Sequence, residues 1–343
     1  MKEGFNKEKV GLTDIAHELK VSVSTVSRAL NNHPRISKKT KERVRQVAVR
    51  LGYFPGIPEL MTPDRTDAVA VVVPSIETCV NREIIAGIEK VMEARGYQTL
   101  LVNLKGDESQ EANFFKTSRN YGISGIIHLN SRRVLPEGFY ATIQKEAIPL
   151  VTIFDSEYDV KVNRVVPDMF QGVVTMVNHL RANGIKKVTL VLEDENDSFD
   201  YHLLSTFGMV LDNSELSDMV LKVNCLGLKN RQFTKEAEAL VNEISYDSAI
   251  VVKEIDFALE ISLTAQKRGV RIPEDFMLIG IGADCVPRSL AAGISILKLP
   301  AVEMGMEAAR LLLSGLQGQD SSGSTVVTPV NFILKQSAIR VKR

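Results

Sequence analysis

Short runs of valine, isoleucine and leucine alternate with helical segments along most of this chain. The first run is AVAVVV at 68–73, followed by the helical pattern NREIIAGIEKVMEARGY and the run QTLLVNL. A second series of the same kind extends from VVTMVNHLRANG to FMLIGIG. Short strands separated by amphipathic helices indicate mostly parallel, doubly wound sheets. Two such series predict two α/β lobes with a cleft between them, which is a common place for a small ligand.

The first 56 residues follow a different pattern. Apolar residues recur at helical spacing in LTDIAHEL, and Ser22 is a good N-cap for a second helix. The buried face of that second helix is predicted to consist of Val26, Ala29 and Leu30. Ser37 is suited to cap a third helix, KKTKERVRQVAVRL. Three short helices with a tight turn between the first two predict a helix-turn-helix head.

The second helix has a polar face that suits the major groove of DNA. Small side chains at Ser22, Ser24, Thr25 and Ser27 let the backbone approach a duplex, and Arg28 is long enough to reach base edges. Phosphate contacts, which fix register but do not read sequence, are predicted for Thr25, Ser27, Asn31, Ser37 and Thr40. The alternative is a solvated three-helix domain with a lysine-rich surface. Spacing, caps and the polar face together favour DNA binding.

Charge is divided unevenly along a chain that is neutral as a whole. Residues 1–56 contain 12 lysines and arginines against 5 acidic residues, a net charge of +7, which leaves −7 for the rest of the 343 residues. A basic head on an acidic body indicates non-specific, salt-dependent attraction of the head to DNA.

The head resembles the DNA-binding domain of the lactose-repressor (LacI/GalR) family. The resemblance lies in TVSRALN and in SKKTKERVRQVAVRLGYFP. It implies that Val23, Ser24 and Arg28 occupy the base-reading positions and that Arg35 lies on a loop that approaches the DNA. Lys20 departs from the family, which usually has glycine in this turn. A left-handed backbone there would cost a lysine about 1 kcal/mol, which a fold tolerates.

The segment at 57–66 does not match the family's hinge. The resemblance implies a hinge helix that inserts leucines into the minor groove, but this chain has IPELMTPDRT, with Pro58, Pro63 and the acidic Glu59. Leu60 or Met61 would be the inserted side chain. The alternative is a plain linker between domains.

The rest of the chain resembles the periplasmic-binding-protein-like effector domain of the same family. The fold class is thus an N-terminal all-α helix-turn-helix head followed by an α/β two-lobed domain. We predict a head at 1–56, a hinge at 57–66 and a two-lobed domain at 67–343. The chain is expected to cross between lobes near Val162, Gly293 and Thr325, so that the first lobe holds 67–161 and 293–324, and the second 162–292 and 325–343. Family members are typically dimers that read near-palindromic operators.

The family's effector positions are largely changed in this sequence. They fall on Val80, Asn81, Asp155, Ser205, Glu254, Ile255, Gly282 and Leu299. Only Asp155 keeps the usual residue type. A buried, hydroxyl-rich ligand needs hydrogen-bonding partners, and most of them are lost here. We predict that the chain does not bind a simple monosaccharide in the family manner: either it takes a different effector, or the cleft is a packed dimerisation scaffold.

Other chemistry has little support in the residues. GIGADC lacks the third glycine of a dinucleotide loop, the histidines have no metal-binding spacing, and no GxSxG motif is present. Cys79, Cys225 and Cys285 lie far apart and suggest neither a disulfide framework nor a zinc site. The acidic run LEDENDSFD lacks the glycine and glutamate of a calcium loop and is predicted to be a solvated rim. We predict no cofactor, no metal and no enzymatic activity.

These observations predict a sequence-specific transcriptional regulator, more often a repressor, that binds double-stranded operator DNA as a homodimer, with a tetramer as the larger option. The N-terminus shows no signal peptide and no apolar run is long enough to span a bilayer, so the predicted location is the cytoplasm, at the nucleoid, with no membrane partner. The alternative, a two-lobed solute-binding protein, would need a signal peptide and no DNA-binding head.

Overall fold

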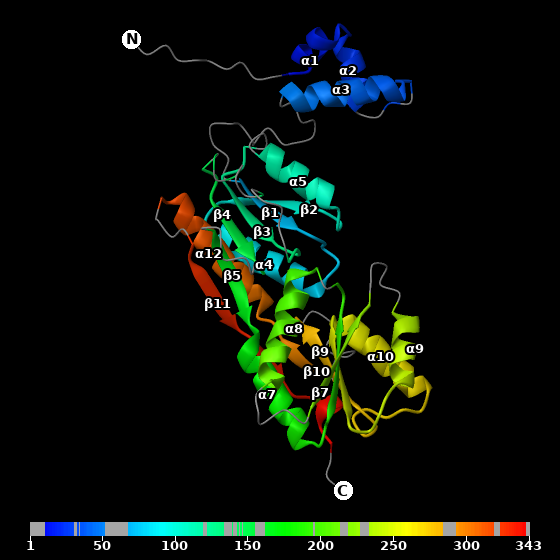
Figure 1. The fold of residues 1–343 in the computed structure, drawn as a ribbon. Coiled ribbons are helices and arrows are strands. Elements are labelled where there is room, and N and C mark those ends of the chain that lie inside the picture. The colour runs from blue at the N-terminus through cyan, green and yellow to red at the C-terminus, as the bar shows by residue number, and fades with distance from the viewer. Residues whose placement is uncertain are drawn as a thin grey trace. The chain divides into compact units, whose positions relative to one another are not determined.

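A computed structural model describes most of the chain as two units. The first contains the helices near the N-terminus and the second contains two α/β lobes (Figure 1). The described residues are 11–30, 33, 35–51, 68–118, 122–133, 139, 143, 145, 147–154, 162–194, 196–212, 219–226, 233–283, 293–318 and 323–340. The predicted sites Asn31, Leu60, Met61 and Asp155 lie outside these ranges.

The first unit is a bundle of helices with one small core. Its helices are α1 (Leu12–Leu19), α2 (Val23–Leu30) and α3 (Lys38–Leu51). The core consists of Ile15, Ala16, Val26, Ala29, Val44 and Ala48. Leu30, which was expected on the buried face of α2, is half-buried and packs at the edge of this core. The predicted helix-turn-helix head is confirmed.

The turn between α1 and α2 has the backbone conformation expected from the sequence. Lys20 ends α1 with φ 53° and ψ 44°, in the left-handed region. Its backbone N–H donates to His17 O at 3.2 Å, and the Val21 N–H donates to Ala16 O at 3.0 Å. These bonds close α1 and offset the roughly 1 kcal/mol that a left-handed conformation costs a non-glycine residue.

The first lobe contains a parallel sheet with strand order β11-β5-β4-β3-β1-β2. Its strands are β1 (Ala68–Val73), β2 (Gln98–Asn103), β3 (Gly125–Leu129), β4 (Leu150–Ile153), β5 (Asn163–Asp168) and β11 (Thr325–Pro329). Its helices are α4 (Cys79–Glu93), α5 (Glu108–Thr117) and α12 (Ala301–Leu316). All of β1 is buried, because helices cover both faces of a doubly wound sheet.

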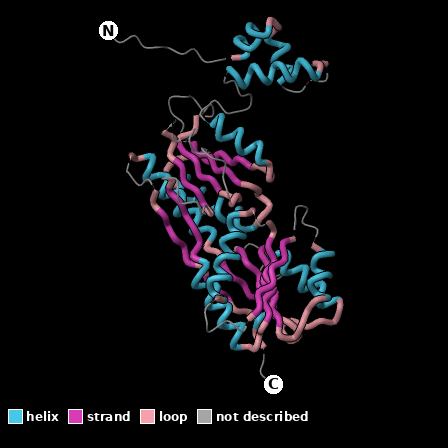
Figure 2. Tube along the Cα trace, in the orientation of Figure 1, coloured by secondary structure: helices cyan, strands magenta, loops and turns pink. Residues whose placement is uncertain are grey.

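The second lobe has the same architecture, with strand order β12-β10-β9-β8-β6-β7 (Figure 2). Its strands are β6 (Lys187–Leu192), β7 (Val220–Cys225), β8 (Ser248–Lys253), β9 (Met277–Gly282), β10 (Ser295–Lys298) and β12 (Asn331–Ile333), with a 3₁₀ turn, η2 (Gln336–Ala338). Its helices are α7 (Met169–Ala182), α8 (Ser198–Leu211), α9 (Thr234–Asn242) and α10 (Ile255–Lys267). Only β12 is antiparallel to its neighbour, and the predicted two-lobed α/β fold is confirmed.

The chain passes between the lobes later than the sequence suggested. The expected crossings were near Val162, Gly293 and Thr325, but β5 and β11 pair with each other in the first sheet and β10 pairs with β9 in the second. The crossings therefore follow Asp168, Lys298 and Pro329. A periodic pattern identifies a strand without saying which sheet it joins, which explains the difference.

Two glycines allow the closest approach of helices in the first lobe. A Cβ atom at Gly305 of α12 would lie 2.1 Å from Ile84 O of α4, and one at Gly87 of α4 would lie 2.1 Å from Val302 O of α12. No side chain fits at those distances, so the two helices touch backbone to backbone at these positions. After β10 in the second lobe, the chain therefore packs again on the first lobe through α12.

Within the described part of the chain, no helix is both long and apolar enough to cross a bilayer.

Candidate DNA interface and interlobe pocket

The exposed face of α2 carries the predicted base-reading residues. Val23, Ser24 and Arg28 are exposed, whereas Val26 and Ala29 on the opposite face are buried. Val23 is 41% exposed, so its methyl groups are available for contact with an apolar partner such as a thymine methyl group. This face can present one apolar group, one hydroxyl and one guanidinium to base edges.

Serine hydroxyls cap the two helices that follow the turns. Ser22 Oγ accepts from the Thr25 N–H at 3.2 Å, and Ser37 Oγ accepts from the Thr40 N–H at 3.1 Å. The hydroxyls of Ser37 and Thr40 also lie 2.8 Å apart. Capped helix N-termini with exposed hydroxyls and free N–H groups are suited to bind phosphate. The other predicted contacts are Thr25 and Ser27, which are half-buried, and Arg35, which is exposed.

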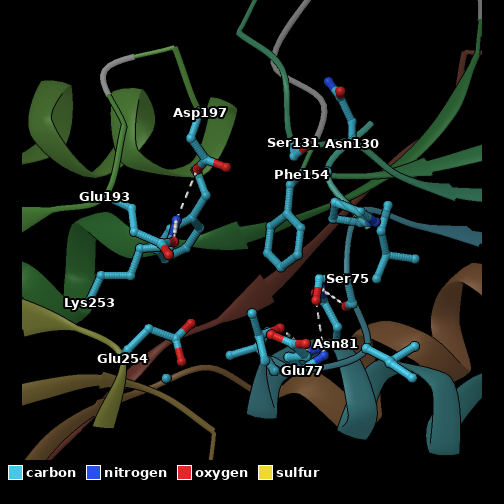
Figure 3. A pocket seen from close by; sticks show the side chains of 18 of the residues that line it. Ser75, Glu77, Asn81, Asn130, Ser131, Phe154, Glu193, Asp197, Lys253 and Glu254 are labelled. Atoms are coloured by element: carbon cyan, nitrogen blue, oxygen red, sulfur yellow. Dashed lines mark hydrogen bonds and ion pairs between the residues drawn. The ribbon is translucent and has the colours of Figure 1, made fainter. Parts of the chain in front are cut away.

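A cavity of about 870 Å³ lies between the two lobes (Figure 3). Segments that follow β1, β2, β3 and β4 line it from the first lobe, and segments that follow β6, β8 and β9 line it from the second. Carboxyl ends of parallel strands are where doubly wound folds bind ligands. The cleft is therefore open and not filled by side chains, which favours the first of the two alternatives from the sequence, a different effector, over a packed dimerisation scaffold.

Backbone strain is concentrated around this cavity. Among the described residues, five other than glycine have positive φ, and three of them line the cavity: Lys105 at 53°, Phe154 at 68° and Glu254 at 78°. Each such conformation costs of order 1 kcal/mol or more and persists only where its surroundings enforce it. Strain of this kind clusters at ligand sites.

One wall of the cavity contains a buried ion cluster, which we call the Lys253 cluster. The Lys253 ammonium lies 2.9 Å from Asp200 Oδ1, 3.1 Å from Asp197 Oδ1 and 3.4 Å from Glu193 Oε2. Asp200 is fully buried, and its Oδ2 accepts the N–H groups of Glu193 and Asp194 at 2.8 and 3.0 Å. The acidic run that was predicted to be a solvated rim is thus partly buried, because Lys253 from the neighbouring strand compensates its charge.

Charge in the Lys253 cluster shifts the pKa of two of its members. Burial lowers the pKa of Lys253, but attraction to Asp197, Asp200 and Glu193 outweighs it and raises that pKa above its ordinary value. Burial, and after it repulsion from Asp200, raises the pKa of the Asp197 carboxyl in spite of Lys253. Burial and the nearby Asp200 therefore disfavour the charged form of Asp197, and Lys253 favours it.

A short clasp joins the two lobes beside the cavity. We use this name for residues 131–133 and Phe154 of the first lobe together with 196–201 of the second. The Arg133 N–H donates to Asn196 O at 2.7 Å, and the Ser198 hydroxyl donates to Phe154 O at 2.6 Å. The Arg133 guanidinium lies 3.8 Å from the centre of the Tyr201 ring. Because Asp197 lies within the clasp, a ligand that contacts it also touches the junction of the lobes.

Cys79, at the start of α4, is disulfide-bonded. The wide spacing of the three cysteines had suggested no disulfide, and this expectation is wrong. Spacing along the chain does not show which cysteines meet in space. Cys225 is exposed and forms no disulfide.

Comparison with known proteins decides the family. A family model for bacterial regulatory proteins of the lacI family matches residues 11–56, and a model for a periplasmic binding protein-like domain matches residues 177–338. The HTH-type transcriptional regulator pepR1 of Lactobacillus delbrueckii subsp. lactis is 24% identical over 98% of this chain and 99% of its own. The catabolite control protein A of Priestia megaterium is 24% identical over 96% and 99%. Residues 11–56 therefore belong to the lacI family of bacterial regulatory proteins. The function of the chain is DNA-binding transcriptional regulation, not enzymatic catalysis.

Solved structures share the fold of this lacI-family protein. A lac repressor dimer bound to operator and the anti-inducer ONPF superposes with a TM-score of 0.68 at 19% identity, covering 97% of this chain and all of that one. A ribose operon repressor from Lactobacillus acidophilus superposes with a TM-score of 0.70 at 20% identity, covering 80% of this chain and all of that one.

The family positions transferred to the cleft are only partly brought together. Val80, Asn81, Glu254, Gly282 and Leu299 line the cavity. Ser205 does not line it: this residue is exposed on the outer side of α8. Ile255, the neighbour of Glu254, is buried in the core of the second lobe. Transfer without gaps misplaces residues on a helix, because an error of one position rotates a side chain by 100°.

Five charged or aromatic residues that line the cavity were not predicted from the sequence. They are Glu193, Asp197, Lys253, Phe154 and Phe199. Glu193, Lys253 and Phe154 each follow the last residue of a strand or end it. The rule that ligands meet the carboxyl ends of parallel strands would have identified these three from the predicted strands alone.

Proposed function

We propose that this lacI-family regulator is a repressor that binds a near-palindromic operator as a dimer and responds to a small effector in the interlobe cavity. The observation that carries the proposal is the exposed Val23, Ser24 and Arg28 face on a helix whose N-terminus is capped by Ser22. Two such heads related by two-fold symmetry would read two half-sites. The relation of this family to DNA also supports a cytoplasmic location.

Domain limits follow from the same proposal. The DNA-binding head extends to about residue 56, a connecting segment spans 57–66, and the two-lobed domain begins at 67. Effector control would act on operator affinity only as far as the effector binds one arrangement of the lobes better than another. The clasp is one set of contacts that differs between such arrangements.

Replacing Arg28 by alanine is expected to weaken binding to the cognate operator by roughly 1–3 kcal/mol and to relax base preference at one position of each half-site. The reason is that a guanidinium reads base edges with paired hydrogen bonds that alanine cannot make. The measurement is a titration of full-length protein with the operator selected from a random duplex library, repeated with random-sequence DNA.

Thr40→Ala serves as the control for Arg28. A phosphate contact carries no sequence information, so this variant should weaken binding to operator and to random DNA by similar factors. If Arg28→Ala lowers the affinity for operator and for random DNA by equal factors, Arg28 does not read base sequence.

A further inference from the structure

We propose that the effector of the interlobe cavity is a cation: a small molecule with a protonated amine and a ring or aliphatic part. This inference rests on the proposed function, since it takes the cavity as the effector site. It specifies the chemical class of the ligand from the groups that line the cavity.

Charge in the cavity wall favours a cation. The described lining residues include four carboxylates, Glu77, Glu193, Asp197 and Glu254, and two ammonium groups, Lys105 and Lys253. Asp200, behind the wall, is ion-paired with Lys253 at 2.9 Å and offsets its charge. A carboxylate has about four lone-pair sites, so one that already has a partner within the protein can still accept a hydrogen bond from a ligand.

Carboxylates stand at two of the helix N-termini that reach the cavity. Helix N-termini bind negative groups, and those of α8 and α10 begin at the cavity. Asp197 caps α8 by accepting the Asp200 N–H at 3.0 Å, and Glu254 occupies the N-cap position of α10. An anionic ligand approaching α8 would therefore meet the Asp197 carboxylate, and one approaching α10 would come close to Glu254, whose side chain makes no capping hydrogen bond.

The side-chain amides of Asn81 and Asn130 already form hydrogen bonds with the backbone of nearby loops. Asn81 Nδ2 donates to Ser75 O at 2.7 Å, and Asn130 binds both the N–H and the carbonyl of Arg132 at 2.9 Å. These side chains are therefore poorly placed to serve the hydroxyls of a neutral sugar. Carboxylate oxygens and apolar surface are further groups that the cavity offers a ligand.

Two aromatic rings give the cavity its apolar surface. Phe154 and Phe199 pack edge to face with their centres 5.5 Å apart, and both line the cavity. Figure 3 shows Glu193, Asp197 and Glu254 on one side of Phe154, and Ser75 and Asn81 on the other. A ligand with its ring or chain against the phenylalanines can thus direct an amine toward the three carboxylates of the second lobe. Aromatic faces also attract cations directly.

The experiment compares ligands that differ in charge alone. Phenethylamine, 2-phenylethanol and phenylacetate share a ring and a similar length but are cationic, neutral and anionic near pH 7. Each is titrated into the full-length protein by calorimetry, with ribose as a sugar control. The amine is expected to bind at least tenfold more tightly than the alcohol, and its affinity should fall with added salt. An amine that binds no more tightly than the alcohol, whether both bind or neither does, overturns the proposal.

Substitutions of single carboxylates test whether the preference for the amine arises in the cavity. Glu254→Gln and, separately, Asp197→Asn should each reduce the preference for the amine over the alcohol by about tenfold, in line with one lost ion contact. Glu89→Gln makes the same charge change at an exposed position of α4 outside the cavity and should leave the preference unchanged. An amine preference that survives both cavity substitutions would also overturn the proposal.

Failure here is distinguishable from failure of the proposed function. Operator binding by the same preparation is measured without any amine. Sequence-specific binding with no amine preference rejects the cationic effector alone, whereas absence of sequence-specific binding rejects the regulatory proposal itself.

Discussion

Replacing Gly305 by alanine is expected to destabilise the two-lobed domain by at least about 3 kcal/mol, because the added methyl group cannot be accommodated. Its Cβ would lie 2.1 Å from the Ile84 carbonyl oxygen and 3.0 Å from the Ile88 nitrogen. Both are backbone atoms of α4, so no side-chain rotation relieves the clash, and α12 must move away from the helix it packs against. Urea unfolding of the full-length protein, followed by circular dichroism, measures the loss.

Gly208→Ala is the matched control for this substitution. Gly208 lies inside α8, and a Cβ atom there would meet nothing within 4 Å. Alanine is expected to stabilise the protein by about 0.5–1 kcal/mol, since glycine is unfavourable within a helix. The same chemical change should therefore have opposite signs at the two positions. A Gly305→Ala midpoint equal to that of the unchanged protein would contradict the backbone contact between α4 and α12.

The strands and helices of both lobes follow from local pattern, but the Gly305 contact does not. The segment at 293–324 was expected in the first lobe, and α12 within it does pack on α4. A glycine in a helical pattern carries no sign that another backbone lies against it, because that depends on a helix more than 200 residues away in the chain. Helix type is local information and helix contact is not.

The DNA-binding face could likewise be predicted from local sequence pattern, whereas the ion pairs of the cavity wall could not. Val23, Ser24 and Arg28 lie on one exposed face because helical spacing alone fixes their directions once Val26 and Ala29 are buried. The Lys253 cluster joins the end of β8 to residues near the end of β6, which are neighbours only in the sheet. Since the charges in LEDENDSFD are compensated by a residue about 55 positions later, the sequence alone made this run look solvated.

Replacing Lys253 by methionine is expected to destabilise the second lobe by roughly 3–5 kcal/mol at pH 7, as when one partner of a buried ion pair is removed. The methionine keeps most of the side-chain volume, but Asp200, which is fully buried, and Asp197 lose the ammonium that lies 2.9 and 3.1 Å away. Thermal and urea unfolding of the variant measure the loss. Adding Asp200→Asn should recover a large part of it, because the amide oxygen still accepts the N–H groups of Glu193 and Asp194.

The pH dependence of the Lys253→Met variant separates lost charge compensation from lost packing. The pKa of Asp197 is already raised by burial and by Asp200, and without Lys253 it should rise further. A carboxyl whose pKa is higher in the folded than in the unfolded state favours folding at low pH, and this contribution disappears as the pH rises through the folded-state pKa. The variant should therefore regain stability relative to the unchanged protein between pH 7 and pH 5. A deficit that stays constant over this range would assign the effect to packing and leave the ion cluster without an energetic role.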